Sequence, residues 1–288
     1  MIKSFFMRTV FALVKVFIPL VIFFLPLTIY ITDFLTANGI PIPVVISKED
    51  LLEITRAILK VINVDVSIKL LENITNFVPL VLTITIGYLL RKFFKNKLFN
   101  NWGNLYYDIP YFIYFLAGKF VLNYGEISLV RVPQPLQFKI VAKNIFSKIA
   151  EEDFSKVDNE EINVVFNDVP YGKTVNLVLS DTFHVLPSSL PDSIEDNYTV
   201  YITRNLEGDP NRKFSPEFVS TVRREVEKFS GVTSVVNIFP YINGNHTKHI
   251  TESCFKVGGR NAIKKINVYQ PNKNKEYRFE NPLEIKLA

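Results

Sequence analysis

Two long apolar runs without a charged residue dominate the hydrophobic pattern of the N-terminal third. The first extends from Val16 to Thr32, between Lys15 and Asp33, and the second from Asn73 to Leu90. At 1.5 Å per residue, runs of this length cross most of a ~30 Å hydrocarbon core. The first run ends without the small residues of a signal-peptide cleavage site. We therefore predict two transmembrane helices, over about residues 9–32 and 73–91.

Beyond residue 132 the pattern changes to short strand-like runs and amphipathic helices. The clearest helix begins at Ser215 and Pro216, buries a stripe that includes Phe218 and Val222, and stops at Gly231. We predict its charged residues, Glu225 among them, to face solvent. A second helix is expected over Leu136–Ile149. Strands are expected over Ile162–Phe166, Thr174–Leu179, Thr199–Thr203, Val232–Phe239, Ile263–Val268 and Tyr277–Phe279.

The predicted fold class is thus an α-helical two-span transmembrane hairpin followed by a cytosolic α/β domain with a mixed sheet. Three parts follow from it: a transmembrane module (1–97) with an external segment (33–72), an interfacial segment (98–132), and the α/β domain (133–288). In the external segment, Ser47 is expected to begin an amphipathic helix. The interfacial segment is rich in Trp and Tyr, which favour the lipid headgroup region. Its alternative role is as the first core element of the α/β domain.

Charge orients the predicted hairpin. Basic residues flank both spans on their outer sides, whereas acidic residues outnumber basic ones between them. Basic flanks are retained in the cytoplasm, so we expect a multi-pass protein of the inner (cell) membrane with both termini cytoplasmic. Residues 1–97 contain 11 of the 33 basic and 6 of the 28 acidic residues, which leaves 22 of each for the rest of the chain. Because that part is neutral overall, double-stranded nucleic acid is not an expected partner.

Two loops of the α/β domain have the composition of an anion site. Gly258 and Gly259 allow close approach of backbone N–H groups to a phosphate, and Arg260, Asn261 and Lys264 follow them. A second set comprises Arg204 at the end of a strand and Arg212 ahead of the helix at Ser215. We interpret both as candidate sites for a nucleotide or other phosphorylated ligand, and expect Arg260→Ala to weaken a ligand response. The alternative is that they are ordinary solvated loops.

Signatures of enzymes are weak in this sequence. Ser180, Asp181 and His184 lie close together, but no nucleophile elbow surrounds the serine. His246, His249 and Cys254 lack the paired spacing of a zinc site, and we interpret the two histidines as surface residues. No phosphate-binding Walker loop or dinucleotide fingerprint occurs. We expect no catalytic residue, no metal and no cofactor; a tethered hydrolase that uses these residues is the weaker alternative.

The predicted spans also contain residues suited to a pore. Prolines inside such helices free backbone carbonyls, and glycine permits close helix packing. Neither run contains a charge, so a gate between them would be a hydrophobic constriction. The candidate pore and gate residues are Pro19, Phe23, Pro26, Pro79, Thr83 and Gly87.

The order of these parts resembles one known group of proteins. Two spans, the aromatic stretch from Trp102 to Phe115, and a tail with a glycine-pair loop at Gly258–Arg260 resemble the two-transmembrane membrane effectors of bacterial nucleotide-signalled (CBASS-like) antiphage defence. The resemblance implies a sensor that assembles on binding a nucleotide messenger and then opens or disrupts the membrane. Membrane lipid and further copies of the chain would be its partners, and acidic residues at 151–196 with basic residues at 256–278 suit contacts between copies. A membrane-anchored scaffold for a protein partner is the alternative function.

Overall fold

The computed structural model describes residues 2–28, 68–103, 105–157, 160–204, 213–256, 262–272 and 277–287, with a few positions between 29 and 67. It separates into two compact units: Met1–Lys97 with Phe115–Gly125, and Leu98–Tyr114 with Glu126–Ala288. The helix predicted from Ser47 and most of the external segment lie outside the described residues.

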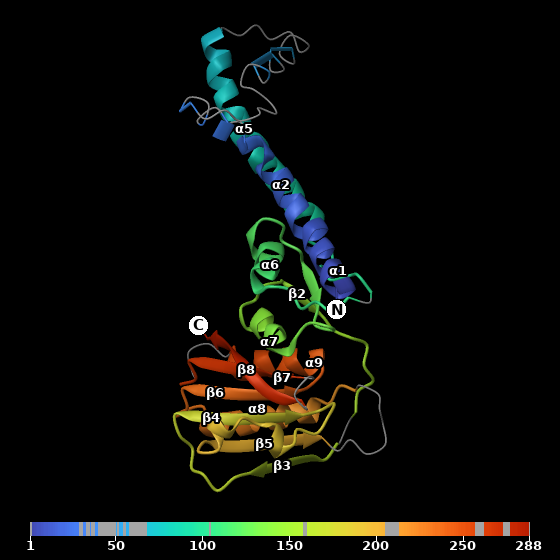
Figure 1. Ribbon diagram of the computed structural model, residues 1–288, viewed down its shortest axis with the longest axis vertical. Coiled ribbons are helices and arrows are strands. Elements are labelled where there is room, and N and C mark those ends of the chain that lie inside the picture. Colours follow the sequence, from blue (N-terminus) through green and yellow to red (C-terminus); the bar gives the residue numbers. More distant parts are fainter. Residues whose placement is uncertain are drawn as a thin grey trace. The chain divides into compact units, whose positions relative to one another are not determined.

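Two long helical stretches build the first unit (Figure 1). The first consists of α1 (Ile2–Ala12), a π-helical turn (Leu13–Phe17), α2 (Ile18–Phe24) and a 3₁₀ turn (Leu25–Leu27), and the second is α5 (Ile68–Phe94). Phe5–Leu27 and Phe77–Phe94 are long and apolar enough to cross a membrane. Both helices begin before the residues at which we predicted them, because helical hydrogen bonding continues into the polar flanks of the apolar runs.

Residues Phe115–Gly125, here called the strap, pack within the first unit although the chain on either side belongs to the second. The Tyr124 hydroxyl donates a hydrogen bond of 3.3 Å to the Lys15 carbonyl in the π-helical turn, and the Tyr124 ring lies 4.3 Å from that of Phe94. The Gly125 N–H donates to the Phe94 carbonyl at 3.3 Å. The chain therefore passes between the two units three times.

The aromatic stretch before the strap divides by burial. Tyr107 and Tyr114 are buried in the second unit, where the Tyr114 hydroxyl donates to the Tyr107 carbonyl. Tyr106 and Phe112 are exposed. The burial of Tyr107 and Tyr114 fits the alternative that we gave for this segment, a core element of the α/β domain, and the interfacial role of the segment stays a prediction.

A six-stranded sheet organises the second unit, in the order β3-β5-β4-β6-β7-β8 (Figure 1). Strands β5, β4, β6 and β7 are parallel, and the two edge strands pair antiparallel to their neighbours. The mixed sheet predicted from the sequence is thus observed. The strands are β3 (Ile162–Phe166), β4 (Thr174–Ser180), β5 (Tyr198–Arg204), β6 (Val235–Tyr241), β7 (Lys265–Asn272) and β8 (Arg278–Lys286), with a separate parallel pair of β1 (Glu126–Ser128) and β2 (Lys148–Ala150).

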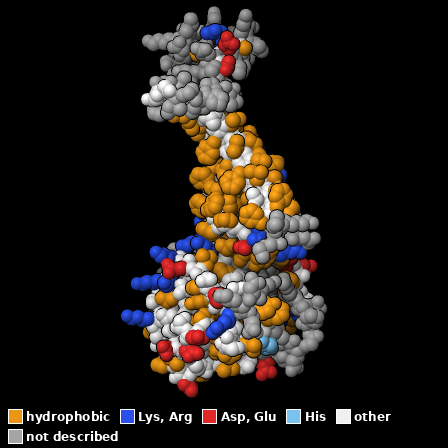
Figure 2. All heavy atoms as spheres, in the orientation of Figure 1, with side chains coloured by type: hydrophobic (Ala, Val, Ile, Leu, Met, Phe, Trp, Pro, Cys, Tyr) orange, Lys and Arg blue, Asp and Glu red, His pale blue; other side chains and the backbone are white. Residues whose placement is uncertain are grey.

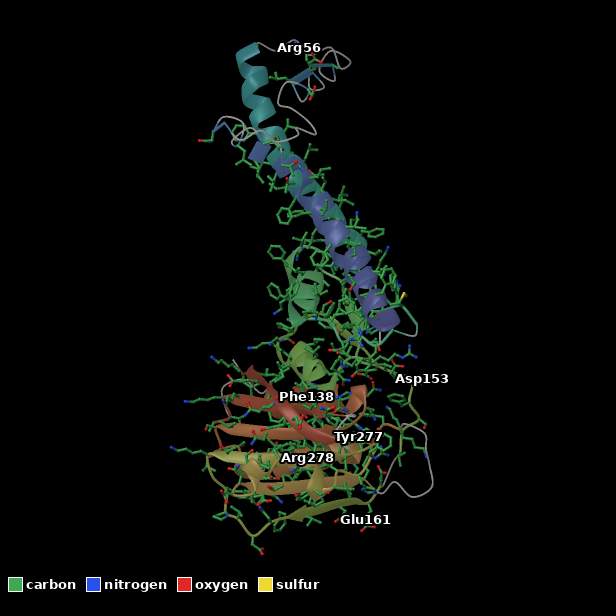
Figure 3. The ribbon with its side chains drawn as sticks, viewed as in Figure 1. Arg56, Phe138, Asp153, Glu161, Tyr277 and Arg278 are labelled. Carbon is green, nitrogen blue, oxygen red and sulfur yellow. The ribbon has the colours of Figure 1, made fainter. Side chains whose placement is uncertain are left out.

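Helices cover one face of this sheet. The helices of the unit are α6 (Tyr111–Phe115), α7 (Gln134–Ala142), α8 (Pro216–Phe229) and α9 (Gly244–Ile250), which continues as a π-helical turn (Thr251–Phe255). Phe138 of α7 (Figure 3), Phe218 of α8 and Ile250 of α9 pack in one core with Leu177 and Ile238 of the central strands. On the other face, Val185, Leu190 and Ile194 of the segment after β4 cover Val178 and Phe239.

Besides shifted strand ends, two details differ from the sequence prediction. The helix expected over Leu136–Ile149 ends at Ala142, and Lys148–Ala150 is strand β2, because β1 offers it a parallel partner. Glu225 of α8 is buried rather than exposed. Its carboxylate accepts two hydrogen bonds from the Lys228 ammonium, at 2.7 and 2.6 Å, which offset the cost of burying the charge.

Candidate functional site

The strand order of the parallel sheet changes direction between β4 and β6. From β4 the chain moves to β5 on one side, and then crosses through α8 to β6 and on to β7 on the other side. In open α/β sheets, ligands bind at such a switch point, outside the carboxyl ends of the strands. The relevant ends here are Ser180 of β4, Arg204 of β5 and Tyr241 of β6.

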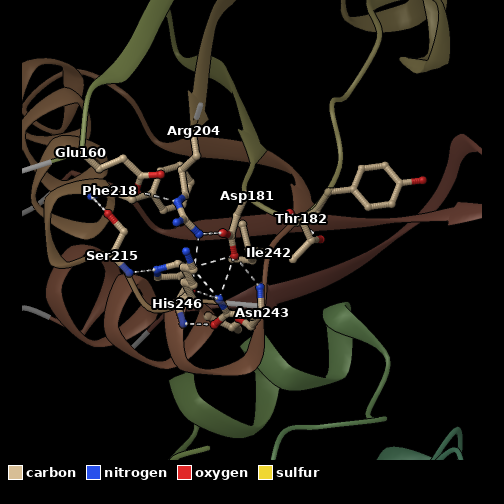
Figure 4. A network of polar contacts seen from close by, with 12 residues as sticks. Glu160, Asp181, Thr182, Arg204, Ser215, Phe218, Ile242, Asn243 and His246 are labelled. Carbon is tan, nitrogen blue, oxygen red and sulfur yellow. Dashed lines mark hydrogen bonds and ion pairs between the residues drawn. The ribbon is translucent and has the colours of Figure 1, made fainter. Parts of the chain in front are cut away.

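A buried polar network joins these three strand ends (Figure 4). Asp181, directly after β4, accepts a hydrogen bond from the Arg204 guanidinium through Oδ1. Its Oδ2 accepts from the Asn243 N–H at 3.0 Å, the Asn243 side-chain amide at 2.9 Å and His246 Nδ1 at 2.7 Å. The Arg204 Nε donates to Glu160 Oε2 at 2.8 Å. Arg204 is 6% exposed, Asp181 1% and His246 0%, so this is a desolvated charge network rather than a surface ion pair.

The network also fixes the start of α8. Arg204 Nη1 at 3.3 Å and Asn243 Nδ2 at 3.0 Å both donate to the Lys213 carbonyl. The Ser215 backbone N–H donates to His246 Nε2 at 2.9 Å. Because a backbone amide can only donate, Nε2 carries no proton, and we assign the neutral tautomer with its proton on Nδ1, directed at Asp181. His246 therefore connects α9, β4 and the first turn of α8.

The Ser215 cap gives a local test of this end of the sheet. Its hydroxyl accepts from the Phe218 N–H at 3.1 Å and so satisfies one of the free amides of the first turn of α8. We expect Ser215→Ala to lower the free energy of unfolding by about 1 kcal/mol, as for other helix caps. Thermal unfolding of the full chain in detergent measures it. Ser220→Ala, on the exposed face of α8, is the control and should leave Tm unchanged.

The electrostatics of the network favour ionised Asp181. Burial alone raises the pKa of this carboxyl, but the hydrogen bonds from His246, Asn243 and Arg204 oppose it and hold the pKa below its usual value. Burial lowers the pKa of Arg204, and the bonds to Glu160 and Asp181 raise it above its usual value overall. Both groups are therefore charged at neutral pH and stabilise each other.

The predicted ligand residues fall at opposite edges of the sheet. Arg204 lies in the network at the carboxyl edge, with Nε and Nη1 already bonded to protein acceptors. Lys264 lies at the amino edge, where its N–H donates to the Ser234 carbonyl just before β6 at 2.9 Å. Arg212 precedes Lys213 of the network, and it lies outside the described residues. The residues Gly258, Gly259, Arg260 and Asn261 also lie outside them.

The residues considered for catalysis are placed differently from our expectation. His246 was interpreted as a surface residue, which is wrong, because it is fully buried and its Nε2 is occupied by the Ser215 N–H. Ser180 is buried, and its hydroxyl accepts from the Val185 N–H at 3.1 Å. Among the described residues, His246, His249 and Cys254 do not form a group that could hold a metal ion. The tethered-hydrolase alternative thus loses His246 as its base, whereas His184, the other histidine that we named for it, is exposed.

The candidate pore residues lie along the contact between α2 and α5. Phe23 lies against Gly87: a Cβ built on this glycine would come within 2.8 Å of Phe23 Cε2. The Thr83 hydroxyl is buried and donates to the Pro79 carbonyl at 2.8 Å. Pro19, Pro26, Pro79 and Gly87 are buried as well. These residues form the seam between the two helices of one chain, and the hydrophobic side chains on the outer surfaces are exposed (Figure 2).

Comparison with known families identifies the group to which the chain is related. Residues 5–285 match the model of the SMODS- and Ubiquitin system-associated 2TM effector domain. The chain belongs to this family. The match extends over both units, so the two apolar helices and the α/β body are parts of one family architecture. The resemblance to two-transmembrane effectors of nucleotide-signalled antiphage defence is confirmed, and the family and the two apolar helices together indicate a membrane protein.

Solved structures add a distant likeness in fold. Two structures of the Acinetobacter baumannii Cap4 SAVED/CARF-domain containing receptor, with the cyclic trinucleotides 3'3'3'-cAAA and 2'3'3'-cAAA, are 10% identical to the chain, with TM-scores of 0.46 and 0.45. In each case the alignment covers 88% of this chain and 73% of the receptor. No curated protein sequence matches the chain.

Sequence reasoning missed most of the network. Asp181 follows β4 directly, and Asn243 is the second residue after β6 and precedes Gly244 at a helix start. Polar residues that follow buried strands are the signal that could have pointed to this edge. His246 could not have been placed there from the sequence, because its partners Asp181 and Ser215 are distant in sequence.

Proposed function

We propose that this family member is an oligomeric, non-enzymatic membrane effector whose α/β unit binds a nucleotide at the carboxyl edge of β4, β5 and β6. Binding there shifts the assembly to a state that conducts ions. The observation that carries the proposal is the convergence of Asp181, Arg204 and Asn243 at the switch point of the sheet.

Arg204 acts as a support for the ligand site rather than as its main cation. Two of its donor nitrogens are bonded to Glu160 and Asp181, so the guanidinium is neutralised before any ligand arrives. Its side chain and Asn243 instead hold the Lys213 carbonyl, one residue after Arg212 in the sequence. We expect the phosphate to meet Arg212, whose neighbour in the chain, Lys213, is held by the network.

The strap offers a route from ligand to spans. It follows Leu98–Tyr114 and precedes β1 in the chain. It bonds to the π-helical turn at Lys15 through Tyr124 and to the last residue of α5 through Gly125. A nucleotide that favours one arrangement of the α/β unit moves the strap and, with it, the π-helical turn at Lys15. Only a difference in affinity between the two arrangements drives this change.

The proposed topology places the α/β unit, and hence the sensor, in the cytoplasm. Arg91 and Lys92 lie in the last turn of α5, Lys95 and Lys97 follow it, and Lys3 and Arg8 lie in the first turns of α1. Basic residues at both outer flanks favour a hairpin in the inner membrane with cytoplasmic termini. A nucleotide made inside the cell then reaches the site directly.

The test is ion efflux from liposomes that contain the full chain, on addition of a panel of cyclic di- and trinucleotides. We expect efflux with at least one of them, and Arg212→Ala should weaken the response by roughly ten- to a hundredfold, as for loss of a charge-assisted hydrogen bond. Arg223→Ala, whose side chain pairs with Glu227 on the exposed face of α8, is the control and should respond normally. If Arg260→Ala loses the efflux response and Arg212→Ala responds normally, the ligand site is instead the set that comprises Gly258, Gly259, Arg260, Asn261 and Lys264. Tight binding without efflux would contradict the gating.

A further inference from the structure

The strap joins the basic ends of the two charge-free apolar runs. Lys15 directly precedes the first run, and Arg91 directly follows the second. The Tyr124 hydroxyl of the strap donates to the Lys15 carbonyl at 3.3 Å, and Arg91 Nη1 donates to the Phe120 carbonyl of the strap at 3.1 Å. The two cations therefore mark the same boundary of the apolar part of this unit.

Lys97 adds a third cation at this boundary. Its backbone N–H donates at 2.9 Å to the Phe94 carbonyl, which also accepts from the Gly125 N–H of the strap. Its ammonium lies 3.1 Å from the centre of the Phe93 ring, and it is close enough to Lys15 for the two charges to interact. Because both charges are positive, this interaction is repulsive.

No carboxylate of this part of the chain compensates the three charges of Lys15, Arg91 and Lys97, here called the basic cluster. Residues 1–32, residues 73–97 and the strap contain no Asp or Glu. Among the described residues, no ion pair involves the cluster, and the Arg91 guanidinium donates to a neutral carbonyl. Lys15 is half-buried, whereas Arg91 and Lys97 are exposed. Like charges held together in this way are stabilised by an anion from outside the chain.

We infer that the basic cluster binds the headgroup phosphate of an anionic phospholipid. The cluster lies where the charge-free runs end, and the charged headgroups lie directly outside the hydrocarbon core that such runs cross. Arginine can donate two hydrogen bonds to one phosphate, and the lysine ammoniums add point charges. Phe93 and Phe120, 59% and 47% exposed, offer apolar surface to the acyl chains of the same lipid.

This site goes beyond the proposed function, because its ligand is a component of the membrane and its occupation does not require a nucleotide. A lipid bound here touches residues on both apolar helices, and the strap holds the same residues by hydrogen bonds. The bound lipid therefore stabilises the attachment of the strap to the two helices.

Thermal unfolding of the full chain in a neutral detergent, with phosphatidylglycerol added stepwise, tests the site. We expect phosphatidylglycerol to raise Tm and phosphatidylcholine at the same concentrations to leave it unchanged, because phosphatidylcholine has no net charge. Lys15→Gln and Lys97→Gln should each raise the phosphatidylglycerol concentration at half-maximal effect roughly fivefold, the effect of one cation beside an anionic headgroup. Lys92→Gln is the matched control and should leave it unchanged. Lys92 is exposed in the last turn of α5 and forms no hydrogen bond to the strap in the described part of the chain.

The Tm without added lipid separates a lost site from a folding defect. Lys15→Gln removes a repulsion, so its Tm in detergent alone should be at least that of the native chain. Equal weakening of the lipid effect by Lys92→Gln and Lys15→Gln would overturn the site, because it would show a diffuse attraction between the basic flanks and the lipid. An equal rise of Tm with phosphatidylcholine would also overturn it. The same rise with inorganic phosphate would assign the cluster to a soluble anion instead of a lipid.

Discussion

Asp181→Ala should destabilise the α/β unit more than any exposed substitution, by about 3–5 kcal/mol, the range for breaking a buried ion pair from one side. The substitution leaves the Arg204 guanidinium with the Glu160 carboxylate and the Lys213 carbonyl, and it removes the acceptor of the Asn243 N–H and of His246 Nδ1. The Asn243 N–H and His246 Nδ1 then lose this acceptor without access to water. For a unit of this size we expect Tm to fall by roughly 6–20 °C, measured by circular dichroism of the full chain in detergent.

Asp192→Ala provides the matched control. Asp192 also pairs with an arginine, Arg278 at 2.9 Å, but its side chain is 85% exposed and that of Arg278 49%. Exposed pairs of this kind contribute about 0–1 kcal/mol. Equal effects of the two substitutions would show that the Asp181 network is solvated and contributes no more than a surface ion pair.

The same carboxylate gives the unit a pH dependence. Because the pKa of Asp181 is lower in the folded chain than in the unfolded chain, the ionised carboxylate stabilises the fold above about pH 4. This contribution disappears as pH falls through the lower, folded-state pKa. The acid destabilisation below pH 4 should therefore be smaller in Asp181→Ala than in the native chain.

The secondary structure of the α/β unit could be predicted because its signals are local. β3 occupies the predicted Ile162–Phe166, and α8 begins after the predicted cap Ser215 and ends before Gly231, since alternation and capping act within a few residues. Helix α7 was predicted too long, because the strand at Lys148–Ala150 depends on pairing with a distant segment. Glu225 was predicted to be exposed, and its burial depends on tertiary packing that helical periodicity does not report.

The candidate site was less predictable, for the same reason. Arg204 could be selected as a cation at a strand end, but its two carboxylate partners lie 23 and 44 residues away in sequence. Strand order, which brings Asp181 beside Asn243 and places Lys264 at the opposite edge, is a property of the whole sheet. The pairing of Phe23 with Gly87 likewise depends on how two helices pack, so composition alone could not separate a seam from a pore surface.

Gly125→Ala should detach the strap from the last residue of α5 and from the π-helical turn at Lys15. A Cβ at this position would lie 1.6 Å from the Lys95 carbonyl oxygen and 2.7 Å from its carbon, so the backbone itself has to move. We expect the free energy of unfolding to fall by more than the 1–3 kcal/mol typical of overpacking, because a backbone cannot rotate away as a side chain does. Hydrogen–deuterium exchange of the full chain should show faster exchange of the Gly125 and Tyr124 amides, which now donate to the Phe94 and Ala117 carbonyls.

Gly231→Ala is the control, since a Cβ there meets no atom within 4 Å, and it should leave exchange of the strap unchanged. If the strap transmits the signal, Gly125→Ala binds the activating nucleotide as the native chain does but fails to release ions from liposomes. Normal efflux together with fast amide exchange in the strap would show that coupling between the units does not pass through Tyr124 and Gly125. Protected strap amides would instead show that the backbone at Lys95 yields to the added methyl group, and that the tight contact of Gly125 is not required.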